Sequence, residues 1–265
     1  MCIRDSVGTP YRINGVIKSG VGIGRNREVY YMSKDFSSTD TSEVSNTNKV
    51  SFYVASERNT LDNKQFATEG THRIHSIRAG YGMESYYPGS TSQVETNSHT
   101  SFFWWSFRMQ NRGYFSFSSP FALGYYLQLQ ATFKPLLSNY YSTIIEAPVF
   151  QPNIVTLGLF MEKYRANQFL AAGLMPVYKF TNQLHAKLEA YAYFPVQEIH
   201  RDINNEAYLG NYFRRMRGML FGSLSFVSVA GPVSLHLGYI ADTDYPWVAQ
   251  LSFGYLLFNK KSSDE

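Results

Sequence analysis

The sequence predicts an all-β protein built as an antiparallel transmembrane β-barrel. The pattern is clearest in Leu184–Phe194, where Leu, Ala and Phe occupy every second position and His, Lys, Glu and Tyr occupy the positions between. A period of two over this length is typical of a β-strand with one apolar and one polar face. At about 3.3 Å per residue the strand is roughly 36 Å long, and tilted near 45° it rises about 25 Å. That rise matches the apolar band of an outer-membrane barrel.

The composition indicates the same fold class. Charged residues make up 17% of the chain, against about 25% in ordinary soluble domains, whereas Tyr (21) and Phe (20) are abundant. Outer-membrane barrels have this balance because aromatic residues line both membrane interfaces and polar positions alternate with apolar ones. The mean hydropathy is −0.26, and no segment approaches the roughly 18 consecutive apolar residues of a spanning helix.

Charge and cysteine content limit the partners and cofactors. A net charge of +4 is modest and spread along the chain, so no nucleic-acid partner is expected. Cys2 is the only cysteine, which leaves no internal disulfide and no thiolate metal site. His72 and His75 are three residues apart, so on a strand they face opposite sides and cannot hold one metal. We therefore predict no metal and no cofactor.

Eleven strands are expected, and Phe121–Phe133 alternates as cleanly as Leu184–Phe194. The segment Gly20–Arg25 is rich in glycine, and because nothing helical follows it, we interpret it as a strand end rather than a phosphate-binding loop. The expected strands are Tyr11–Gly22, Arg27–Ser33, Val50–Asn59, Thr71–Ser85, Ser101–Phe115, Phe121–Phe133, Gln168–Phe180, Leu184–Val196, Arg217–Val229, Val233–Ile240 and Trp247–Phe258.

The connections between these strands largely alternate between short and long. The short ones are Ile23–Asn26, Thr60–Gly70, Ser116–Pro120, Thr181–Gln183 and Ala230–Pro232; the long ones are Lys34–Lys49, Tyr86–Thr100, Lys134–Asn167, Gln197–Met216 and Ala241–Pro246. This asymmetry is expected when periplasmic turns lie at one end of a barrel and extracellular loops at the other. A soluble sandwich, or a barrel with an apolar interior, also alternates along its strands. Strand length and loop asymmetry favour the membrane barrel.

One domain is expected over residues 7–265, without internal repeats, helical periodicity or a domain boundary. Met1–Ser6 resembles the translation of a transposon-type sequencing adapter. We interpret it as an adapter-derived scar and leave it out of the expected fold.

Three segments carry a resemblance to a known family. Asn59–Thr71 looks like a periplasmic turn, Tyr164-Arg165-Ala166 ends the longest loop, and Phe253–Phe258 looks like a terminal strand that the barrel assembly machinery reads. In this order they resemble the bacterial surface antigen barrels of the outer-membrane assembly-factor superfamily. More narrowly, the chain is similar to the C-terminal barrel of patatin-like phospholipases. Ala166 stands where the family's loop motif has Gly, and no aromatic residue follows it directly.

The resemblance implies a Gram-negative outer-membrane location and a family barrel of sixteen strands. The chain from Tyr11 would supply about the last eleven, so on its own it is expected to form an open, strongly curved sheet with unpaired edges. Outer-membrane lipids and the barrel assembly machinery are the implied partners, and Gly254 and Phe258 belong to the terminal strand that this machinery reads. The resemblance leaves open whether the barrel forms a homodimer. The implied role is to anchor, and to export or position, an upstream lipid-hydrolysing patatin-like domain. The alternatives are an assembly or secretion factor without an enzyme, and a passive porin or adhesin.

The chain itself is not expected to be catalytic. A patatin-type serine needs a Gly-x-Ser-x-Gly turn that exposes its oxygen above a sheet, and this pattern does not occur. The nearest strings, at Ser90 and Ser223, lack the second glycine, and no Asp precedes a Gly.

Two structural sites are predicted. Arg165, on a long loop that folds inward, would pair with Glu189 in the lumen through charge-assisted hydrogen bonds. In the alternative reading, Arg165 is a solvated loop cation and Glu189 pairs with Lys187 or Arg217. Aromatic residues near strand ends are predicted to line the membrane interface, with ordinary core packing as the alternative; they are Trp104, Trp105, Phe133, Phe194, Tyr245 and Trp247, together with Phe115 and Phe117.

Overall fold

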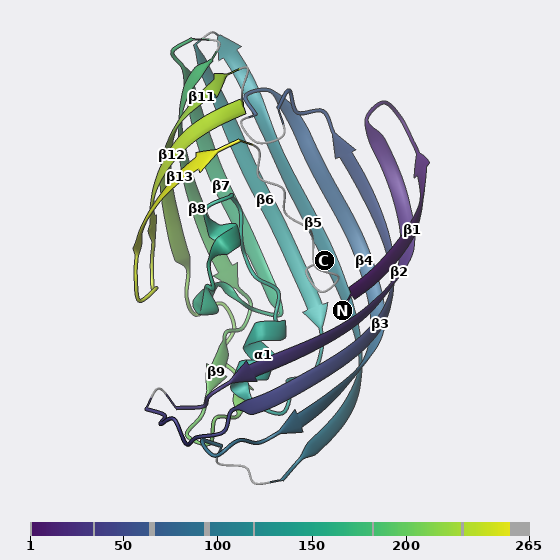
Figure 1. Ribbon diagram of the computed structural model, residues 1–265. Helices are drawn as coiled ribbons and strands as arrows, with labels where there is room; N and C mark the ends of the chain where they lie inside the picture. Colours follow the sequence, from purple (N-terminus) through teal and green to yellow (C-terminus); the bar gives the residue numbers. More distant parts are fainter. Residues whose placement is uncertain are drawn as a thin grey trace.

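The structure is a computed structural model that describes residues 2–33, 35–63, 67–92, 96–118, 120–181, 183–228 and 231–254. Eleven antiparallel strands form one sheet (Figure 1). They are β1 (Cys2–Pro10), β2 (Gly15–Tyr30), β3 (Glu43–Asn59), β4 (Gly70–Tyr87), β5 (Ser98–Ser118), β6 (Phe121–Phe133), β7 (Gln168–Lys179), β8 (Leu184–Pro195), β11 (Arg217–Ser228), β12 (Gly231–Ile240) and β13 (Trp247–Phe253).

The sheet is open and strongly curved. Its strands are ordered as they occur in the chain, and among the described residues β1 and β13 form its two edges. Each strand pairs with the next one in the sheet in antiparallel register, for example Phe221 with Glu189 between β11 and β8. The predicted all-β, antiparallel, open curved sheet of eleven strands is confirmed.

The first two strands differ from the prediction. Instead of two strands over Tyr11–Gly22 and Arg27–Ser33, Cys2–Pro10 pairs with one long strand, Gly15–Tyr30. The chain turns at residues 11–14, where Arg12 and Asn14 have positive φ. Strand β1 therefore includes residues 2–6, which were expected to lie outside the fold.

The glycines that suggested a strand end lie in the middle of β2. A Cβ on Gly20 would lie 2.3 Å from the Asp5 carbonyl oxygen and 2.8 Å from the Tyr53 ring. Glycine is required here because a neighbouring backbone and a large ring approach closely. The interpretation of Gly20–Arg25 as a strand end was wrong, and the segment Ile23–Asn26 stays paired with β3.

The shorter connections lie mostly at one end of the sheet and the longer ones mostly at the other, as expected, although 60–69 is longer than 241–246. The stretches between strands at one end are 11–14, 60–69, 119–120, 180–183 and 229–230, and at the other end 31–42, 88–97, 134–167, 196–216 and 241–246. We call these the short-loop end and the long-loop end. In Figure 1 the long-loop end is at the bottom.

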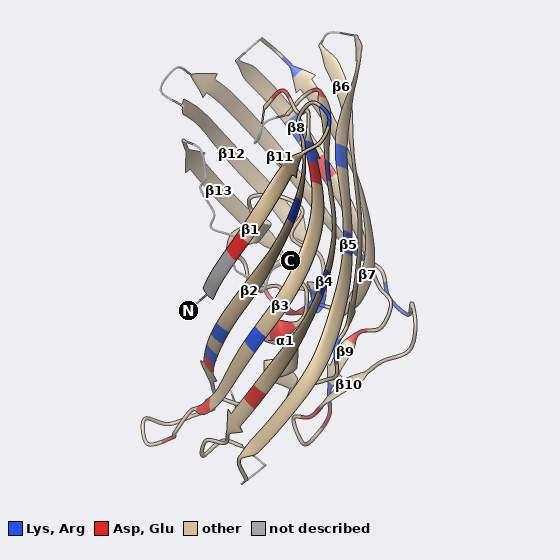
Figure 2. Ribbon diagram, turned by 90° about the vertical axis from the view of Figure 1, so that its right-hand side faces the viewer, with Lys and Arg blue, Asp and Glu red and all other residues tan. Residues whose placement is uncertain are grey.

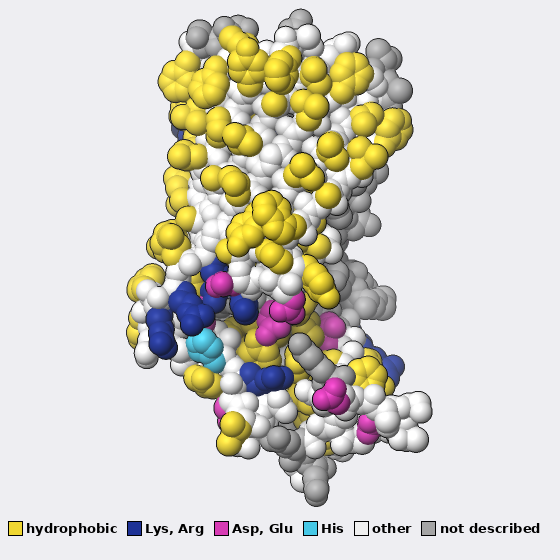
Figure 3. Space-filling model, turned by 90° about the vertical axis from the view of Figure 1, so that its left-hand side faces the viewer, with side chains coloured by type: hydrophobic (Ala, Val, Ile, Leu, Met, Phe, Trp, Pro, Cys, Tyr) yellow, Lys and Arg dark blue, Asp and Glu magenta, His cyan; other side chains and the backbone are white. Residues whose placement is uncertain are grey.

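The two faces of the sheet have opposite character. Along β8, Leu188 is 58% exposed, whereas Glu189 is 7% exposed and Tyr193 is fully buried. We call the face that carries Leu188 the convex face and the face that carries Glu189 the concave face. Apolar side chains form rows across the convex face, while charged side chains gather toward the long-loop end (Figure 3). Figure 2 shows long uncharged stretches along β1–β5.

Two long connections contain short helices or strands that were not predicted from the sequence. Residues 134–167 include the helix α1 (Tyr140–Glu146) and two 3₁₀ turns, Thr156–Gly158 and Glu162–Tyr164. Residues 196–216 include a small hairpin of β9 (Ile199–Arg201) and β10 (Ala207–Leu209). Within the described ranges, no helix is both long enough and apolar enough to cross a membrane.

Candidate functional site

The candidate site is the concave face together with residues 134–167, which we call the inserted loop. This loop lies inside the curve of the sheet (Figure 1). It leaves β6 and returns in β7, yet its side chains reach strands on both sides of that hairpin. The loop therefore links parts of the sheet that are distant in sequence.

The first half of the inserted loop is anchored to β2 and β4. The side chain of Asn139 begins α1 by accepting a hydrogen bond from the Ser142 backbone N–H at 2.9 Å, and the same side chain donates to the Tyr30 hydroxyl at 2.8 Å. Glu84 accepts hydrogen bonds from the Ser138 backbone N–H at 2.9 Å and from its hydroxyl at 2.8 Å. A helix of seven residues is only marginally stable by itself, so these contacts fix its position.

Glu146, the last residue of α1, is the centre of a buried charge cluster. Its carboxylate pairs with Lys49 of β3, lies 3.4 Å from Lys134 Nζ, and accepts a hydrogen bond of 2.9 Å from the Asn26 amide. Burial, reinforced by the neighbouring Lys49 ammonium, holds the pKa of Lys134 well below its ordinary value of 10.5. One carboxylate thus serves two ammonium groups, and the cluster depends on Glu146.

The second half of the inserted loop packs into an apolar core on the concave face. Phe150 and Tyr164 are fully buried. The Phe150 ring stacks on Tyr193 of β8 with centroids 5.5 Å apart, and its edge meets Tyr126 of β6 at 6.0 Å. Because well-packed aromatic rings contribute strongly to stability, this part of the loop behaves as a core element rather than a solvated connection.

Tyr164 fastens the end of the inserted loop to the far side of the sheet. Its hydroxyl donates to the Gly218 carbonyl at 2.8 Å and contacts the Ala241 carbonyl at 3.0 Å. Burial raises the pKa of Tyr164, which keeps the hydroxyl protonated as a donor. Together with the Tyr30 and Glu84 contacts, this bond makes the loop a brace between β2–β4 and β11–β12.

Arg165 and Glu189 do not form the expected pair. The Arg165 guanidinium donates to the Ile145 and Ala147 carbonyls at 2.8 and 3.1 Å, where α1 ends. Glu189 pairs with Lys187, two residues away on the same face, and accepts a hydrogen bond of 2.8 Å from Asn153 of the inserted loop. The prediction was wrong because the carbonyls at the end of a helix need donors and Arg165 is adjacent to them. Of the alternatives, the Glu189–Lys187 pair is the one observed.

Arg217, the other alternative partner of Glu189, has a different role. At the start of β11 it pairs with Glu198, and its Nε donates to Asp242 at 3.2 Å. Arg217 belongs to β11, Glu198 to the connection 196–216 and Asp242 to the connection 241–246, and both connections lie at the long-loop end. This ion-pair network fixes the two connections to each other.

Most of the predicted interface aromatics lie on the convex face near the long-loop end. Trp105 stacks on Phe133 with centroids 4.0 Å apart, and Trp247 meets Tyr239 edge-on at 5.1 Å. Phe194 lies next to the last residue of β8 at this level, Tyr245 is in the connection before β13, and Phe115 and Phe117 are exposed near the short-loop end. Trp104 is the exception. Since neighbours on a strand face opposite sides, it lies on the concave face, against Gly80.

The segments that carried the resemblance are partly described. In the turn after β3, Asp62 accepts hydrogen bonds from the Thr68 backbone N–H at 2.9 Å and from its hydroxyl at 2.7 Å. Burial raises the pKa of Asp62, but these bonds and one from the Glu69 backbone outweigh it, so the pKa lies below its ordinary value. Strand β13 ends at Phe253, and Gly254 follows with a φ of 81°. Phe258 and residues 64–66 lie outside the described residues.

Ser223, His72 and His75, the residues weighed for chemistry, lie within strands of the sheet. Ser223 lies in the middle of β11, away from any turn that would expose it as a nucleophile. Across the described part of the chain, no three His, Cys, Asp or Glu side chains gather as a metal site. The concave face instead presents packed aromatics and paired charges, an arrangement suited to holding the inserted loop in place.

Sequence reasoning missed the inserted loop's structure, although two signals were present. Asn139 and Ser142 have the spacing of a helix-starting pair, and Phe150 and Tyr164 are large aromatic residues inside a connection expected to be polar. Both signals become clear once the loop is seen to be buried.

The fold and site define a class: an open antiparallel sheet with an apolar convex face and a polar concave face braced by a long inserted loop. No protein-family model matches the sequence, and no curated protein is detectably similar to it.

Proposed function

We propose that this chain is the membrane domain of a Gram-negative outer-membrane protein. In this proposal the convex face contacts lipid tails, and the concave face surrounds an interior occupied by the inserted loop. The supporting observation is that exposed apolar side chains fill the middle of the convex face from strand to strand. Leu174, Leu188 and Leu237, on three different strands, are 59%, 58% and 56% exposed.

Water is an unfavourable solvent for such a face. Fully burying one leucine side chain stabilises a protein by about 1.5–3 kcal/mol. Monomeric soluble proteins seldom expose contiguous apolar patches of more than a few hundred Å², and larger patches mark contact with a membrane or a partner. Aromatic residues at both ends of the convex face match the belts that membrane barrels place at their interfaces.

The inserted loop bears on which kind of membrane protein this is. A passive porin keeps a water-filled lumen. Here Phe150 and Tyr164 are buried against the concave face, and the loop braces strands on both sides of it. This arrangement favours a membrane domain with an occupied interior over a passive porin.

The narrower proposal rests on the sequence resemblance. In it, the domain anchors, and exports or positions, an upstream patatin-like phospholipase domain at the outer membrane. The alternative is a barrel that assembles or secretes other proteins. The contiguous upstream reading frame distinguishes them, since Gly-x-Ser-x-Gly after a strand with a later Asp-Gly supports the enzyme. Repeated periplasmic α/β modules alone would support the alternative.

Membrane association is tested by flotation. The protein is purified in detergent, mixed with lipid vesicles, and layered under a density gradient after detergent removal. We expect it to float with the vesicles and to precipitate when they are omitted. Protein that stays monodisperse in detergent-free buffer and remains at the bottom of the gradient would contradict the proposal.

A further inference from the structure

The register of the sheet shows a polar band that crosses the convex face toward the long-loop end. Ile23, Val50 and Tyr81 lie side by side on β2, β3 and β4, and Phe103 of β5 continues the row. The next row toward the long-loop end is Arg25, Asn48, Met83 and Ser101, and the one after it is Arg27, Asn46, Ser85 and His99. The convex face thus has a boundary between the apolar row of Ile23 and two mostly polar rows, and the row beyond these, Val29, Val44 and Tyr87, is apolar again.

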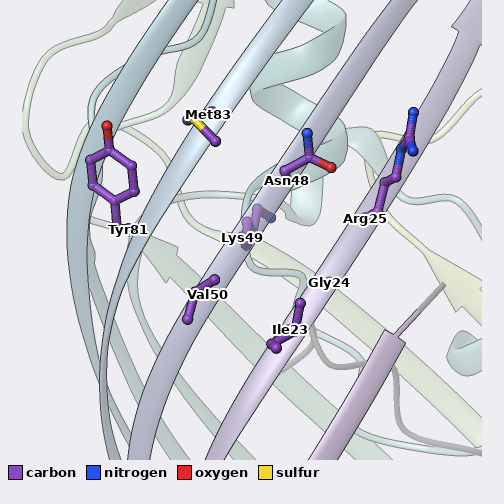
Figure 4. A pocket seen from close by; sticks show the side chains of 8 residues that line it. All are labelled: Ile23, Gly24, Arg25, Asn48, Lys49, Val50, Tyr81 and Met83. Carbon is purple, nitrogen blue, oxygen red and sulfur yellow. The ribbon is translucent and has the colours of Figure 1, made fainter.

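A shallow hollow of about 310 Å³ lies at this boundary. Its apolar wall is formed by Ile23, Val50, Tyr81 and Met83, each about half exposed on the convex face. Arg25 and Asn48 form its side toward the long-loop end (Figure 4). Lys49 lies behind the strands, on the side of α1, where it pairs with Glu146.

Two arginines stand at the polar side of the hollow. Arg25 and Arg27 are exposed and lie two residues apart on β2, so both side chains project from the convex face about 7 Å apart. Guanidinium groups bind phosphate oxygens through paired, charge-assisted hydrogen bonds. The amides, hydroxyl and imidazole of Asn46, Asn48, Ser85 and His99 are donors and acceptors suited to sugar hydroxyls.

We infer that this hollow binds one phosphorylated, acylated glycolipid of the surrounding leaflet. The acyl chains lie over Ile23, Val50, Tyr81 and Met83, and the phosphate lies between the Arg25 and Arg27 guanidinium groups. The inference rests on the proposed membrane function, because it requires the convex face to be in lipid. It adds a specific ligand to a particular level of that face, the headgroup level at the long-loop end.

The test uses the protein purified in detergent micelles and native mass spectrometry with lipid A, a phosphorylated, acylated disaccharide, as the probe. We expect one lipid A to stay bound to the wild-type protein. Removing the lipid's phosphates, or changing both arginines in Arg25→Gln/Arg27→Gln, should weaken binding about tenfold or more. The matched control is Arg73→Gln, which removes an exposed arginine of β4 near the short-loop end and should leave binding unchanged.

A second variant tests the apolar half of the site. Val50→Trp fills the hollow without changing its charge, so the acyl chains lose their place and binding should weaken several-fold. Binding that is equal in wild type, Arg25→Gln/Arg27→Gln and Val50→Trp would overturn the site. Equal affinity for phosphatidylglycerol would overturn the assignment to a glycolipid.

These outcomes separate the two proposals. Protein that still requires detergent and floats with vesicles but shows no preference for phosphorylated lipid A would remove the site and leave the membrane function standing. Protein that stays monodisperse without detergent would remove both.

Discussion

The convex and concave faces of this sheet consist of alternate residues of the same strands, yet they have opposite chemistry. The convex face exposes leucines and aromatic rings to the surroundings, while the concave face buries Arg78, Glu84, Glu189 and Arg217. An ordinary soluble sheet places its apolar face on a core and its polar face in water. Here the covered face is the polar one, and the inserted loop supplies the cover.

The comparison shows that alternation alone does not distinguish a membrane sheet from a soluble one. The informative observation is which face is covered. Buried charges on the concave face are paired, as Arg217 is with Glu198 and Asp242 and Glu189 is with Lys187, because an unpaired buried charge is costly. Along the middle rows of the convex face most side chains are apolar, among them Val54, Ile77 and Leu188.

The largest loss of stability is expected from Phe150→Ala, on the concave side. It removes a fully buried ring that packs on Tyr193, so we expect the free energy of unfolding in detergent to fall by about 3–5 kcal/mol. Phe213→Ala, at an exposed loop phenylalanine, serves as the control and should change stability little. Similar losses in the two variants would contradict a packed loop.

The next largest effect is expected from a charge placed on the convex face. Leu188→Arg should destabilise the protein in bilayers by about 2–4 kcal/mol, because the midplane of a membrane disfavours arginine on a lipid-facing strand. Ile203→Arg, at an exposed loop position, should be neutral. Urea unfolding from lipid vesicles measures both. If Leu188→Arg also leaves the stability unchanged, the convex face is in contact with water and not with lipid.

The charge cluster around Glu146 gives a pH dependence. Burial holds the pKa of Lys134 well below 10.5, so between the folded and unfolded values the unfolded chain binds more protons. The free energy of unfolding should therefore rise with pH in that window, by up to about 1.4 kcal/mol per pH unit. Lys134→Met should lose this dependence, whereas Lys163→Met, at an exposed residue of the same loop, should keep it. A wild-type stability that falls as pH rises through the window would contradict the account of the cluster.

The smallest expected effect is at the short-loop end. Asp62→Ala removes hydrogen bonds that Thr68 and Glu69 donate to an exposed carboxylate, so we expect a loss of about 0.5–1 kcal/mol. Because the pKa of Asp62 lies below its ordinary value of 3.8, the difference should shrink as the pH falls through that range. Denaturant titrations at pH 7 and pH 3 measure it; Glu69→Ala is the neutral control.

The regular parts of the fold could be predicted from the sequence because a period of two persists through whole strands. Phe121–Phe133 was predicted with the bounds that the structure has. The predicted first hairpin is wrong because glycine does not end a strand here; at Gly20 it makes room for the Tyr53 ring. The prediction that Trp104 lines the membrane interface was wrong because neighbouring residues on a strand face opposite sides, so Trp104 and Trp105 cannot both do so.

The site was predictable only in part, since it depends on contacts between distant segments. An inward-folding loop was expected, and residues 134–167 do lie inside the curve of the sheet. The partners of Arg165 could not be known, because α1 was not recognised and its unpaired carbonyls are what Arg165 binds. A seven-residue helix is too short to show helical periodicity in a sequence.

The central claim, that the convex face contacts lipid, can be measured by spin labelling along β8. Since Cys2 is the only cysteine, Cys2→Ser permits single labels at each position from 186 to 192 in protein reconstituted in bilayers. We predict that collision with oxygen, which concentrates in lipid, is high at 186, 188, 190 and 192 and low at 187, 189 and 191. Oxygen collision without this alternation, or labels at 188 and 190 that collide mainly with a water-soluble nickel complex, would contradict the account.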